Sequence, residues 1–378
     1  MTEKLYDKNS YLNSFESTVL ECFENKNGFV VVLDKTAFFP EGGGQAADTG
    51  FLGEAKVFDV QIKNDIIYHY TDKPIDTGIR VLGKIDFARR FAFMQNHTGE
   101  HIVSGITHKL HGLNNVGFHL GEDFVTVDFD GQLTRAQLNE IEYLANQKVW
   151  QNLPVRVYYP SKEELETAVY RSKKEIEGAV RLVEVKDTDI CACCAPHVKT
   201  TGEIGVIKLL NFERMRGGIR IILKCGEFAL NDYRVKYENI ADISALLSAK
   251  QENTAEAVKI LDQKFADEKR KNSELKNKIA QLTVDTADKN TNCIFIEDCD
   301  MKVLQLIADK LHKTYGGIKG AFGASGEGYS FAICGDECEI DEFFKKFKSE
   351  LSVKGGGRGG IVQGTVNNAD ADKIKLYF

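Results

Sequence analysis

Short apolar runs alternate with turn-forming residues over the first 90 positions of the chain. Each run is rich in β-branched and aromatic side chains, and Asn, Asp, Gly or Pro separates it from the next. Such runs are typical of short strands, and their spacing favours a small closed sheet. The expected strands lie at residues 19–23, 29–33, 56–62, 66–70 and 79–85. We therefore predict a small β-barrel domain over residues 1–90.

Residues 91–232 combine helical and extended patterns. A helix over 89–110 would place Phe93, His97 and His101 on one face, and the segment 135–151 has the spacing of an amphipathic helix. Apolar runs predict strands at residues 124–129, 155–159 and 180–185. This mixture predicts an α+β domain.

The remainder of the chain divides into two further segments. Residues 235–285 carry apolar side chains at three- and four-residue spacing without Pro or Gly, which predicts a long helix or coiled-coil stalk. Glu268 and Asn272 occupy seam positions, and both a helical hairpin and a dimer stalk remain open. Residues 290–378 follow the order strand, helix, strand, helix, strand and carry a glycine-rich loop at 355–360, which predicts a small α/β domain.

Composition places the chain among soluble globular proteins. Its 378 residues are 43% hydrophobic and 28% charged, and no apolar run is long enough to cross a membrane. The N-terminus lacks the pattern of an export signal, so a cytoplasmic location is expected. Nine cysteines in such a chain favour reduced thiols and metal ligation over disulfides. The formal charge of −7 argues against a broad basic surface, so any nucleic-acid contact requires a local patch.

Two pairs of metal-ligand residues stand out, His97 with His101 and Cys193 with His197. Each pair is four positions apart, a spacing that puts both side chains on one face of a helix. Together they offer the His and Cys mixture that suits Zn²⁺. Glu100 precedes the second histidine, whereas the metalloprotease motif needs Glu directly after the first, so that class is not supported.

Two questions about this zinc site stay open. Cys191 and Cys194 are also close to His197, and only the four-residue spacing favours Cys193. Four protein ligands are typical of a closed structural zinc site, whereas catalysis needs an open position. The sequence does not decide between these two kinds of site.

A segment that runs from Thr36 to Gln45 carries three consecutive glycines, Gly42, Gly43 and Gly44. Such glycines allow close approach of the backbone and expose N–H donors, although a plain hairpin turn is the simpler interpretation. No Gly-Lys-Ser/Thr follows, so the segment is not a P-loop. Thr36 and Gln45 offer neutral hydrogen-bonding groups beside apolar side chains, a combination suited to recognising a small polar side chain.

Two arginines are further candidates for substrate contact. Arg358 lies in a glycine pattern that formally matches the dinucleotide-binding fingerprint, but a helix precedes it and a strand follows, so we reject that fold. It remains a candidate contact for phosphate or a base, with a flexible connecting loop as the alternative. Arg220 belongs to a local basic run, for which a solvated strand face is the alternative.

In this order, the motifs resemble the alanyl-tRNA editing family, which comprises the AlaX trans-editing proteins and the editing domain of alanyl-tRNA synthetase. The collinear matches are the segment 36–45, Asp48-Thr-Gly50, the His97 and His101 pair, Cys193 to Val198, Thr201-Gly-Glu-Ile-Gly205 and Gly218-Ile-Arg-Ile221. The tail resembles the C-terminal part of the same synthetases, so the whole chain resembles the long form of AlaX. The family's Cys-Gly-Gly-Thr-His reads Cys-Cys-Ala-Pro-His here.

The resemblance implies a zinc-dependent trans-editing hydrolase that deacylates mischarged Ser-tRNA(Ala), Gly-tRNA(Ala) or both. One Zn²⁺ per chain would be bound by His97, His101, Cys193 and His197. The implied catalytic residues are Thr36, Gln45 and Cys193, with Thr36 reading the serine hydroxyl and Gln45 orienting the ester or the water. The implied substrate-binding residues are Gly42, Gly43, Gly44, Arg220 and Arg358. The expected partners are the charged tRNA and a second copy of the chain, joined through the stalk and the C-terminal domain.

Two other functions compete with this hypothesis. One is a tRNA-binding or assembly module in which the zinc is structural and no ester is hydrolysed. The other is a nuclease or phosphoesterase, which the tail suggests only weakly because the chain lacks a DHH triplet.

Overall fold

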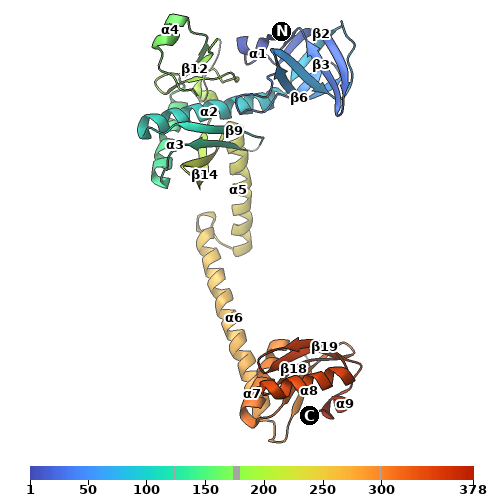
Figure 1. Ribbon diagram of the computed structural model, residues 1–378. Helices are drawn as coiled ribbons and strands as arrows, with labels where there is room; N and C mark the ends of the chain where they lie inside the picture. The colour runs from blue at the N-terminus through green and yellow to red at the C-terminus, as the bar shows by residue number, and fades with distance from the viewer. Residues whose placement is uncertain (123, 173–178, 298) are drawn as a thin grey trace. The chain divides into compact units, whose positions relative to one another are not determined.

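The chain folds into two compact units, Met1–Asn239 and Ile240–Phe378. The computed structural model describes residues 1–122, 124–172, 179–297 and 299–378 (Figure 1). Helices and several sheets occur together, which confirms the α+β class. The boundary between the units lies inside the segment expected to form the stalk. The four domain ranges expected from the sequence stay predictions.

The N-terminal part of the first unit is built from antiparallel strands. Six of them close into a barrel in the order β2-β3-β7-β6-β5-β8. Their bounds are β2 (Ser14–Asn25), β3 (Gly28–Leu33), β5 (Gly50–Leu52), β6 (Ala55–Lys63), β7 (Ile66–Thr71) and β8 (Arg80–Ile85). Strand β8 alternates exposed and buried residues, as expected for a strand with one face in a core. Outside the barrel, β1 (Glu3–Lys4) pairs in parallel with β4 (Lys35–Thr36), and α1 (Leu5–Lys8) follows β1.

A four-stranded sheet and a three-stranded sheet form the rest of this unit. The first has the order β14-β15-β10-β9 and the second the order β11-β12-β13. Their strands are β9 (Asn115–Leu120), β10 (Val125–Phe129), β11 (Val155–Tyr158), β12 (Leu182–Val185), β13 (Asp189–Ala192), β14 (Ile207–Met215) and β15 (Gly218–Cys225). The helical elements are α2 (Phe87–His111), α3 (Arg135–Trp150), α4 (Lys162–Thr167) and the 3₁₀ turn η1 (Thr201–Ile204).

Helix α2 is the central element of the first unit. The side chain of Asp86 caps its start by accepting a hydrogen bond from the Arg89 N–H, and Gly112 ends it in the left-handed conformation. Residues 92–107 are all buried, because α3, η1, β9, β13 and β15 pack around the helix. Several of these buried residues are polar, so their hydrogen-bonding groups need partners inside the protein.

The expected long helix is divided into two. Helix α5 (Gly226–Leu247) and helix α6 (Thr254–Asp285) are separated by a turn that includes the short 3₁₀ helix η2 (Gln251–Asn253). Ser248 ends α5 with a φ of 50°, a conformation that an α-helix cannot continue. Uninterrupted apolar spacing therefore did not reveal the break, and the coiled coil stays a prediction.

The second unit contains a five-stranded sheet in the order β16-β17-β18-β20-β19. Only β16 and β17 pair in parallel. The strands are β16 (Cys293–Ile296), β17 (Lys319–Ser325), β18 (Gly328–Cys334), β19 (Ser352–Gly357) and β20 (Ile361–Asn367), and the helices are α7 (Met301–Tyr315), α8 (Glu337–Glu350) and α9 (Ala371–Lys375). The sheet has a core on each face: Phe322 and Phe331 face the core that includes α8, while Ala321 and Ala332 face the one that includes α7.

The glycine-rich loop expected at 355–360 is shorter than the sequence suggested. Gly355, Gly356 and Gly357 belong to strand β19 rather than to a loop. A Cβ atom on Gly355 would lie 2.3 Å from the carbonyl oxygen of Gln363, so glycine permits the close approach of β19 and β20. No helix in the described part of the chain is long and apolar enough to cross a membrane.

Candidate metal centre and its surroundings

The two ligand pairs expected from the sequence meet in the first unit. His97 and His101 lie one turn apart on α2, and Cys193 and His197 lie in the segment after β13. The Cys193 Sγ lies 3.5 Å from His97 Nε2 and 3.4 Å from His197 Nε2. One potential ligand atom from each of the four residues lies within 4.8 Å of the others. The three histidines are each only 2% exposed.

These four residues fit a tetrahedral zinc ion. Zinc–nitrogen bonds of about 2.0–2.1 Å and a zinc–sulfur bond of about 2.3 Å would place nitrogen and sulfur about 3.5 Å apart. The observed separations from Cys193 Sγ agree with that value. Burial, with the neighbouring His101 and His97, lowers the pKa of His197, so its imidazole is in the neutral form that binds metals. Burial raises the pKa of the Cys193 thiol, a trend that a bound cation opposes.

The three cysteines near this centre differ in their surroundings. Cys193 belongs to the group with three histidines, whereas Cys191 groups with His101 and Asp189. Cys194 is exposed and belongs to neither group among the residues that the structure describes. The arrangement supports Cys193 as the thiol ligand.

A carboxylate that the sequence analysis missed lies behind His101. Asp189 Oδ2 is 3.3 Å from His101 Nδ1. Arg171 Nε and Nη2 donate to the two carboxylate oxygens of Asp189 at 2.6 and 2.8 Å. Carboxylates in this position orient metal-binding histidines so that the other ring nitrogen faces the metal. Asp189 lies two residues before Cys191, but nothing in that spacing indicates contact with α2.

Gln45 joins the glycine-rich segment to this centre. Its Oε1 is 2.8 Å from His97 Nδ1, so that nitrogen donates its proton and Nε2 is left for a metal. The side chain of Gln45 is 1% exposed, and its Nε2 has no hydrogen-bond partner within the described ranges. Two amide N–H donors are therefore buried beside the metal centre and available to a ligand.

Backbone constraints at the glycines hold Gln45 in place. Gly42 and Gln45 exchange backbone hydrogen bonds of 3.1 and 3.0 Å, and the Leu120 N–H donates to the Gly44 carbonyl at 2.7 Å. Gly44 has a φ of +85°, and a Cβ there would lie 2.6 Å from the Phe118 carbonyl oxygen. Only glycine fits this position without strain. Gly43 also has a positive φ of +62°, but its Cβ would meet only Cys194 Sγ, at 3.5 Å.

Thr36 lies in the same segment, and its side-chain hydrogen bonds within the described residues go to His69 and Phe38 rather than to the metal-ligand residues. It is fully buried, with its Oγ1 2.9 Å from His69 Nε2 and 3.1 Å from the Phe38 nitrogen. Sequence reasoning did not identify His69, which stands 33 positions away on β7.

A buried ion pair fixes the segment between Thr36 and Gln45 to α2. Arg90 Nε donates to both carboxylate oxygens of Asp48 at 2.9 and 3.0 Å, and Nη2 donates to the Ala37 carbonyl at 2.7 Å. Asp48 in turn accepts the Phe39 N–H at 2.6 Å. Both side chains are almost inaccessible to solvent. Asp48 thus links the segment that contains Thr36 and Gln45 to helix α2.

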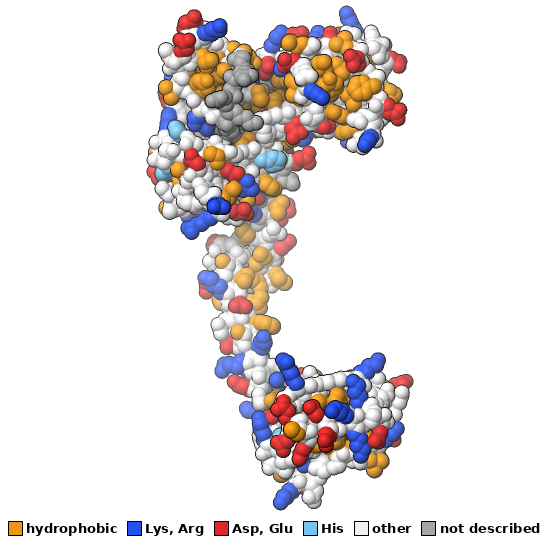
Figure 2. Space-filling view, viewed as in Figure 1, with side chains coloured by type: hydrophobic (Ala, Val, Ile, Leu, Met, Phe, Trp, Pro, Cys, Tyr) orange, Lys and Arg blue, Asp and Glu red, His pale blue; other side chains and the backbone are white. Residues whose placement is uncertain are grey.

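The two arginine candidates belong to other elements than the metal-ligand residues. Arg220 lies on β15, where its Nε and Nη2 each donate to Asp128 at 2.7 Å, so its charge is already paired. Arg358 is exposed between β19 and β20 in the second unit. Acidic and basic side chains are interspersed on the face drawn in Figure 2.

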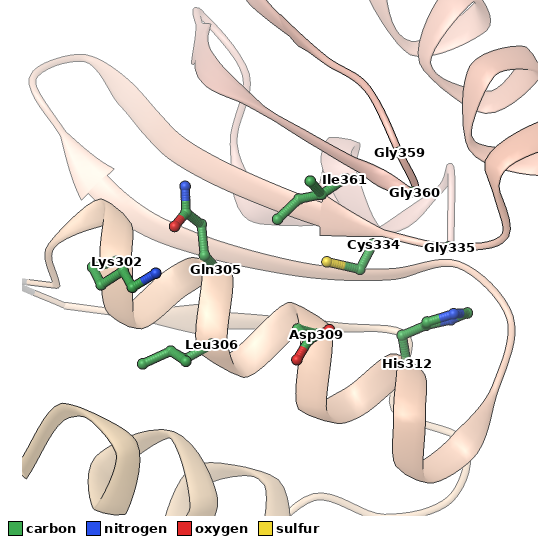
Figure 3. A pocket seen from close by; sticks show the side chains of 10 residues that line it. All are labelled: Lys302, Gln305, Leu306, Asp309, His312, Cys334, Gly335, Gly359, Gly360 and Ile361. Carbon is green, nitrogen blue, oxygen red and sulfur yellow. The ribbon is translucent and has the colours of Figure 1, made fainter. Parts of the chain in front are cut away.

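The second unit has a hollow of its own, about 340 Å³ in volume, between α7 and the ends of β18 and β20. Figure 3 shows Gln305, Asp309 and His312 of α7 opposite Gly359 and Gly360. Lys302, Leu306, Cys334, Gly335 and Ile361 complete the lining, so the hollow contains part of the glycine-rich loop but not Arg358.

Comparisons with known proteins agree with this site. Residues 180–222 match the threonyl and alanyl tRNA synthetase second additional domain, and residues 7–89 match class II (A) tRNA synthetases. The first match includes Cys193 and His197 of the metal centre. Two stretches of the first unit are thus similar to domains of tRNA synthetases.

Individual relatives make the identification narrower. The alanyl-tRNA editing protein Aarsd1-A of Xenopus laevis is 29% identical over 90% of this chain and 85% of its own length. The alanine–tRNA ligase of Pyrococcus abyssi is 29% identical over 99% of this chain, and that of Pyrococcus furiosus is 30% identical over the same share. The chain spans 43% of the length of each ligase. The chain is a homologue of the alanyl-tRNA editing proteins and of alanine–tRNA ligases.

Proposed function

We propose that the chain hydrolyses the ester bond of tRNA(Ala) that carries serine or glycine, and so protects alanine codons from mistranslation in the cytoplasm. One observation carries the proposal: among the described residues the buried amide of Gln45 has no partner for its N–H groups, and its oxygen contacts His97 of the four-residue group. Unpaired buried donors are costly in a folded protein, so their retention beside a metal centre supports a binding role.

The residues present supply what ester hydrolysis requires. An aminoacyl ester is already activated, so holding it beside a water and stabilising the developing negative charge on its carbonyl oxygen is sufficient. The Gln45 Nε2 donates to that oxygen, and the Thr36 hydroxyl meets the serine side chain. His97, His101, Cys193 and His197 would hold a zinc ion, whose charge would add to the stabilisation of the same oxygen.

The remaining candidates would bind the tRNA. The backbone of Gly42, Gly43 and Gly44 approaches the ester, while Arg220 and Arg358 contact the nucleic acid. Arg220 is 40% exposed, so it retains a free face even though Asp128 neutralises part of its charge.

The proposal is tested by charging one tRNA(Ala) with serine, glycine or alanine in turn. The chain is expected to release serine or glycine and to spare alanine. Gln45→Glu keeps the shape of the side chain and the oxygen that faces His97 but removes the N–H donors, so we expect the rate to fall by about 10²–10³. Gln151→Ala, at an exposed position, should leave the rate unchanged. Equal release from all three esters contradicts the proposal, and so does release from none.

The competing proposal is a tRNA-binding or assembly module with a structural zinc. It is supported by the group of four potential ligands, which together would fill the four positions of a structural zinc site and leave none open. It predicts tight tRNA binding without ester hydrolysis, and no effect of Gln45→Glu.

Metal content tests the ligand assignment separately. We expect about one zinc per chain, lost in the His97→Ala/His101→Ala double variant and retained in Cys194→Ala. Zinc retained in Cys193→Ala and lost in Cys191→Ala would show that Cys191, and not Cys193, is the thiol ligand.

We also propose a homodimer through the stalk and the C-terminal domain. Helix α6 carries exposed apolar side chains at three- and four-residue spacing: Val258, Leu261, Phe265, Leu275, Ile279 and Leu282. Phe265→Lys should weaken the dimer in equilibrium sedimentation, whereas Gln263→Lys adds the same charge outside this apolar stripe and should not. A monomeric wild-type chain contradicts the proposal.

A further inference from the structure

His69 is a buried histidine whose two ring nitrogens are both in hydrogen bonds. Its Nδ1 lies 3.0 Å from the carbonyl oxygen of Val31, which can only accept, so Nδ1 carries a proton. Complete burial lowers the pKa of His69 to about 4, so the ring is neutral near pH 7. A neutral ring has only one N–H, and Nε2 is therefore an acceptor.

The tautomer of His69 determines the direction of the next hydrogen bond. Thr36 Oγ1 lies 2.9 Å from His69 Nε2, so the threonine hydroxyl must donate its proton to the ring. The same oxygen accepts the Phe38 N–H at 3.1 Å. A hydroxyl has one proton and two lone pairs, so Thr36 has only one lone pair left for a ligand.

We propose that His69 is a positioning residue that fixes the Thr36 hydroxyl as an acceptor, and that the chain thereby selects aminoacyl esters whose side chain donates a hydrogen bond. This inference rests on the proposed function and narrows it, because serine carries such a donor whereas alanine and glycine do not. Thr36 is shielded from water, so an ester without a donor leaves its lone pair unpaired. Sites of this kind reject analogues that lack the matching group more strongly than apolar pockets do.

A set of three esters on one tRNA separates a donor requirement from a size requirement. Serine donates and accepts, alanine does neither, and 3-fluoroalanine has nearly the size of serine but offers only a weak acceptor. The wild-type chain should hydrolyse the serine ester about 100-fold or more faster than either of the others, measured as kcat/KM. Comparable rates for serine and 3-fluoroalanine overturn the inference.

Variants of His69 test the positioning role. His69→Phe keeps a ring to pack against Phe38 but removes the acceptor, so the Thr36 proton is free to rotate. We expect the preference for serine over 3-fluoroalanine to fall by about tenfold or more. His69→Gln can present an amide oxygen to Thr36 and should restore most of the preference. Thr36→Ser should retain it, and Thr36→Val should abolish it. A preference unchanged in His69→Phe or in Thr36→Val overturns the inference.

Two controls separate a failure of this inference from other failures. Serine release by the wild-type chain with unchanged preference in folded His69→Phe overturns the inference alone, whereas no release from any ester overturns the proposed function and this selectivity together. Nitrogen-15 NMR of the wild-type chain reports the tautomer without activity or mutation. We expect a protonated Nδ1 and a bare Nε2 for His69, with the Nε2 resonance shifted in Thr36→Val. A protonated Nε2 overturns the inference.

Discussion

Single hydrogen bonds decide what several buried side chains of the first unit can do. Gln45 Oε1 accepts a hydrogen bond from His97 Nδ1–H, which leaves the His97 Nε2 lone pair for a metal and the buried Gln45 Nε2 without a partner among the described residues. Val31 has the corresponding effect on His69, and through it on Thr36. In each case a backbone or amide oxygen accepts a hydrogen bond from Nδ1 and so fixes the tautomer of the histidine. The tautomer then determines whether Nε2 presents a lone pair to its neighbour.

The pKa of His69 makes a pH-dependent contribution to stability. Burial lowers this pKa from 6.5 to about 4, so the unfolded chain binds a proton before the folded chain does. The contribution is fully present above about pH 6.5, and it is lost as the pH falls towards 4. At about pH 5 the loss is on the order of 2 kcal/mol.

Urea unfolding at about pH 7.5 and about pH 5 measures this contribution. The free energy of unfolding should fall more between these conditions in the wild type than in His69→Gln, whose side chain does not titrate. Other titrating groups are common to both chains and cancel in the comparison. Equal falls in the two chains would show that His69 titrates normally in the folded state.

Gly44 and Gly43 form a matched pair for testing backbone constraint. Both have positive φ, so an alanine at either costs about 1 kcal/mol in backbone energy. At Gly44 the new Cβ also meets the Phe118 carbonyl at 2.6 Å, so Gly44→Ala should be the more destabilising and should reduce ester hydrolysis by displacing Gln45. Urea unfolding and the serine-release assay check both effects, and equal behaviour of the two variants is the contrary result.

At the scale of residues, the sequence indicated the potential metal ligands but not the side chains that hydrogen-bond to the site residues. The spacing within each pair indicated His97, His101 and His197, and the structure places these residues together with Cys193. Asp189 and His69 were missed because each contacts its partner only after separate strands and helices have packed. The spacing of residues along the sequence does not indicate such contacts between distant segments.

Helix α2 is the element on which the site depends. It carries two of the four metal-ligand residues, and through Arg90 it also holds the segment that contains Thr36 and Gln45. Because residues 92–107 of α2 are all buried, the polar side chains among them are fixed by protein partners rather than by solvent. The site is therefore built on a buried helix, and the hydrogen bonds of Arg90 hold the glycine-rich segment against that helix.

The Arg90–Asp48 pair should be among the most sensitive contacts in the first unit. Asp48→Asn leaves the Arg90 guanidinium buried without its counter-charge, which is expected to cost about 3–5 kcal/mol. The exposed pair Lys271–Glu268 on α6 is the control, and Glu268→Gln should produce little measurable change. Chemical denaturation measures both effects, with a probe in the first unit for Asp48→Asn and a probe in the second unit for Glu268→Gln. A similar small effect of both changes would mean that the buried pair contributes little.

Elements with a clear period were predicted well, and those that depend on distant pairing were not. The expected helix over 135–151 and the expected strand at 29–33 correspond to α3 and β3. Strand β19 was mistaken for a loop because its glycines carry no side-chain pattern. The helix break after Leu247 was not predicted, because Ser248 adopts a positive φ and no Gly or Pro at this position signals the end of a helix.

At the scale of the whole molecule, the chain consists of two units that have separate hydrophobic cores. The metal-ligand residues lie entirely within Met1–Asn239, while Ile240–Phe378 is built around its own sheet. Loss of a metal should therefore affect the stability of the first unit and not that of the second.

Calorimetry with and without a chelator tests this separation. We expect two unfolding transitions, of which one moves down by more than about 5 °C when metal is removed and the other stays in place. A fluorescent label at the exposed Cys338, attached in a Cys194→Ala variant because Cys194 is also exposed, should assign the unaffected transition to the second unit. A parallel shift of both transitions would contradict the independence of the two cores.

The separation of the two ligand pairs along the chain has a consequence for synthesis on the ribosome. Cys193 follows His101 by roughly 90 residues, so the long-range contact that completes the centre closes a large loop. At about 5–20 residues per second, His97 and His101 emerge about 5–20 s before the thiol that joins them. The barrel strands have left the ribosome by then, but Cys193 and His197 have not yet been added to the group of potential ligands. If the centre holds a metal ion, all four residues can bind it only after His197 has been translated, so complete coordination would be a late event in the synthesis of the chain.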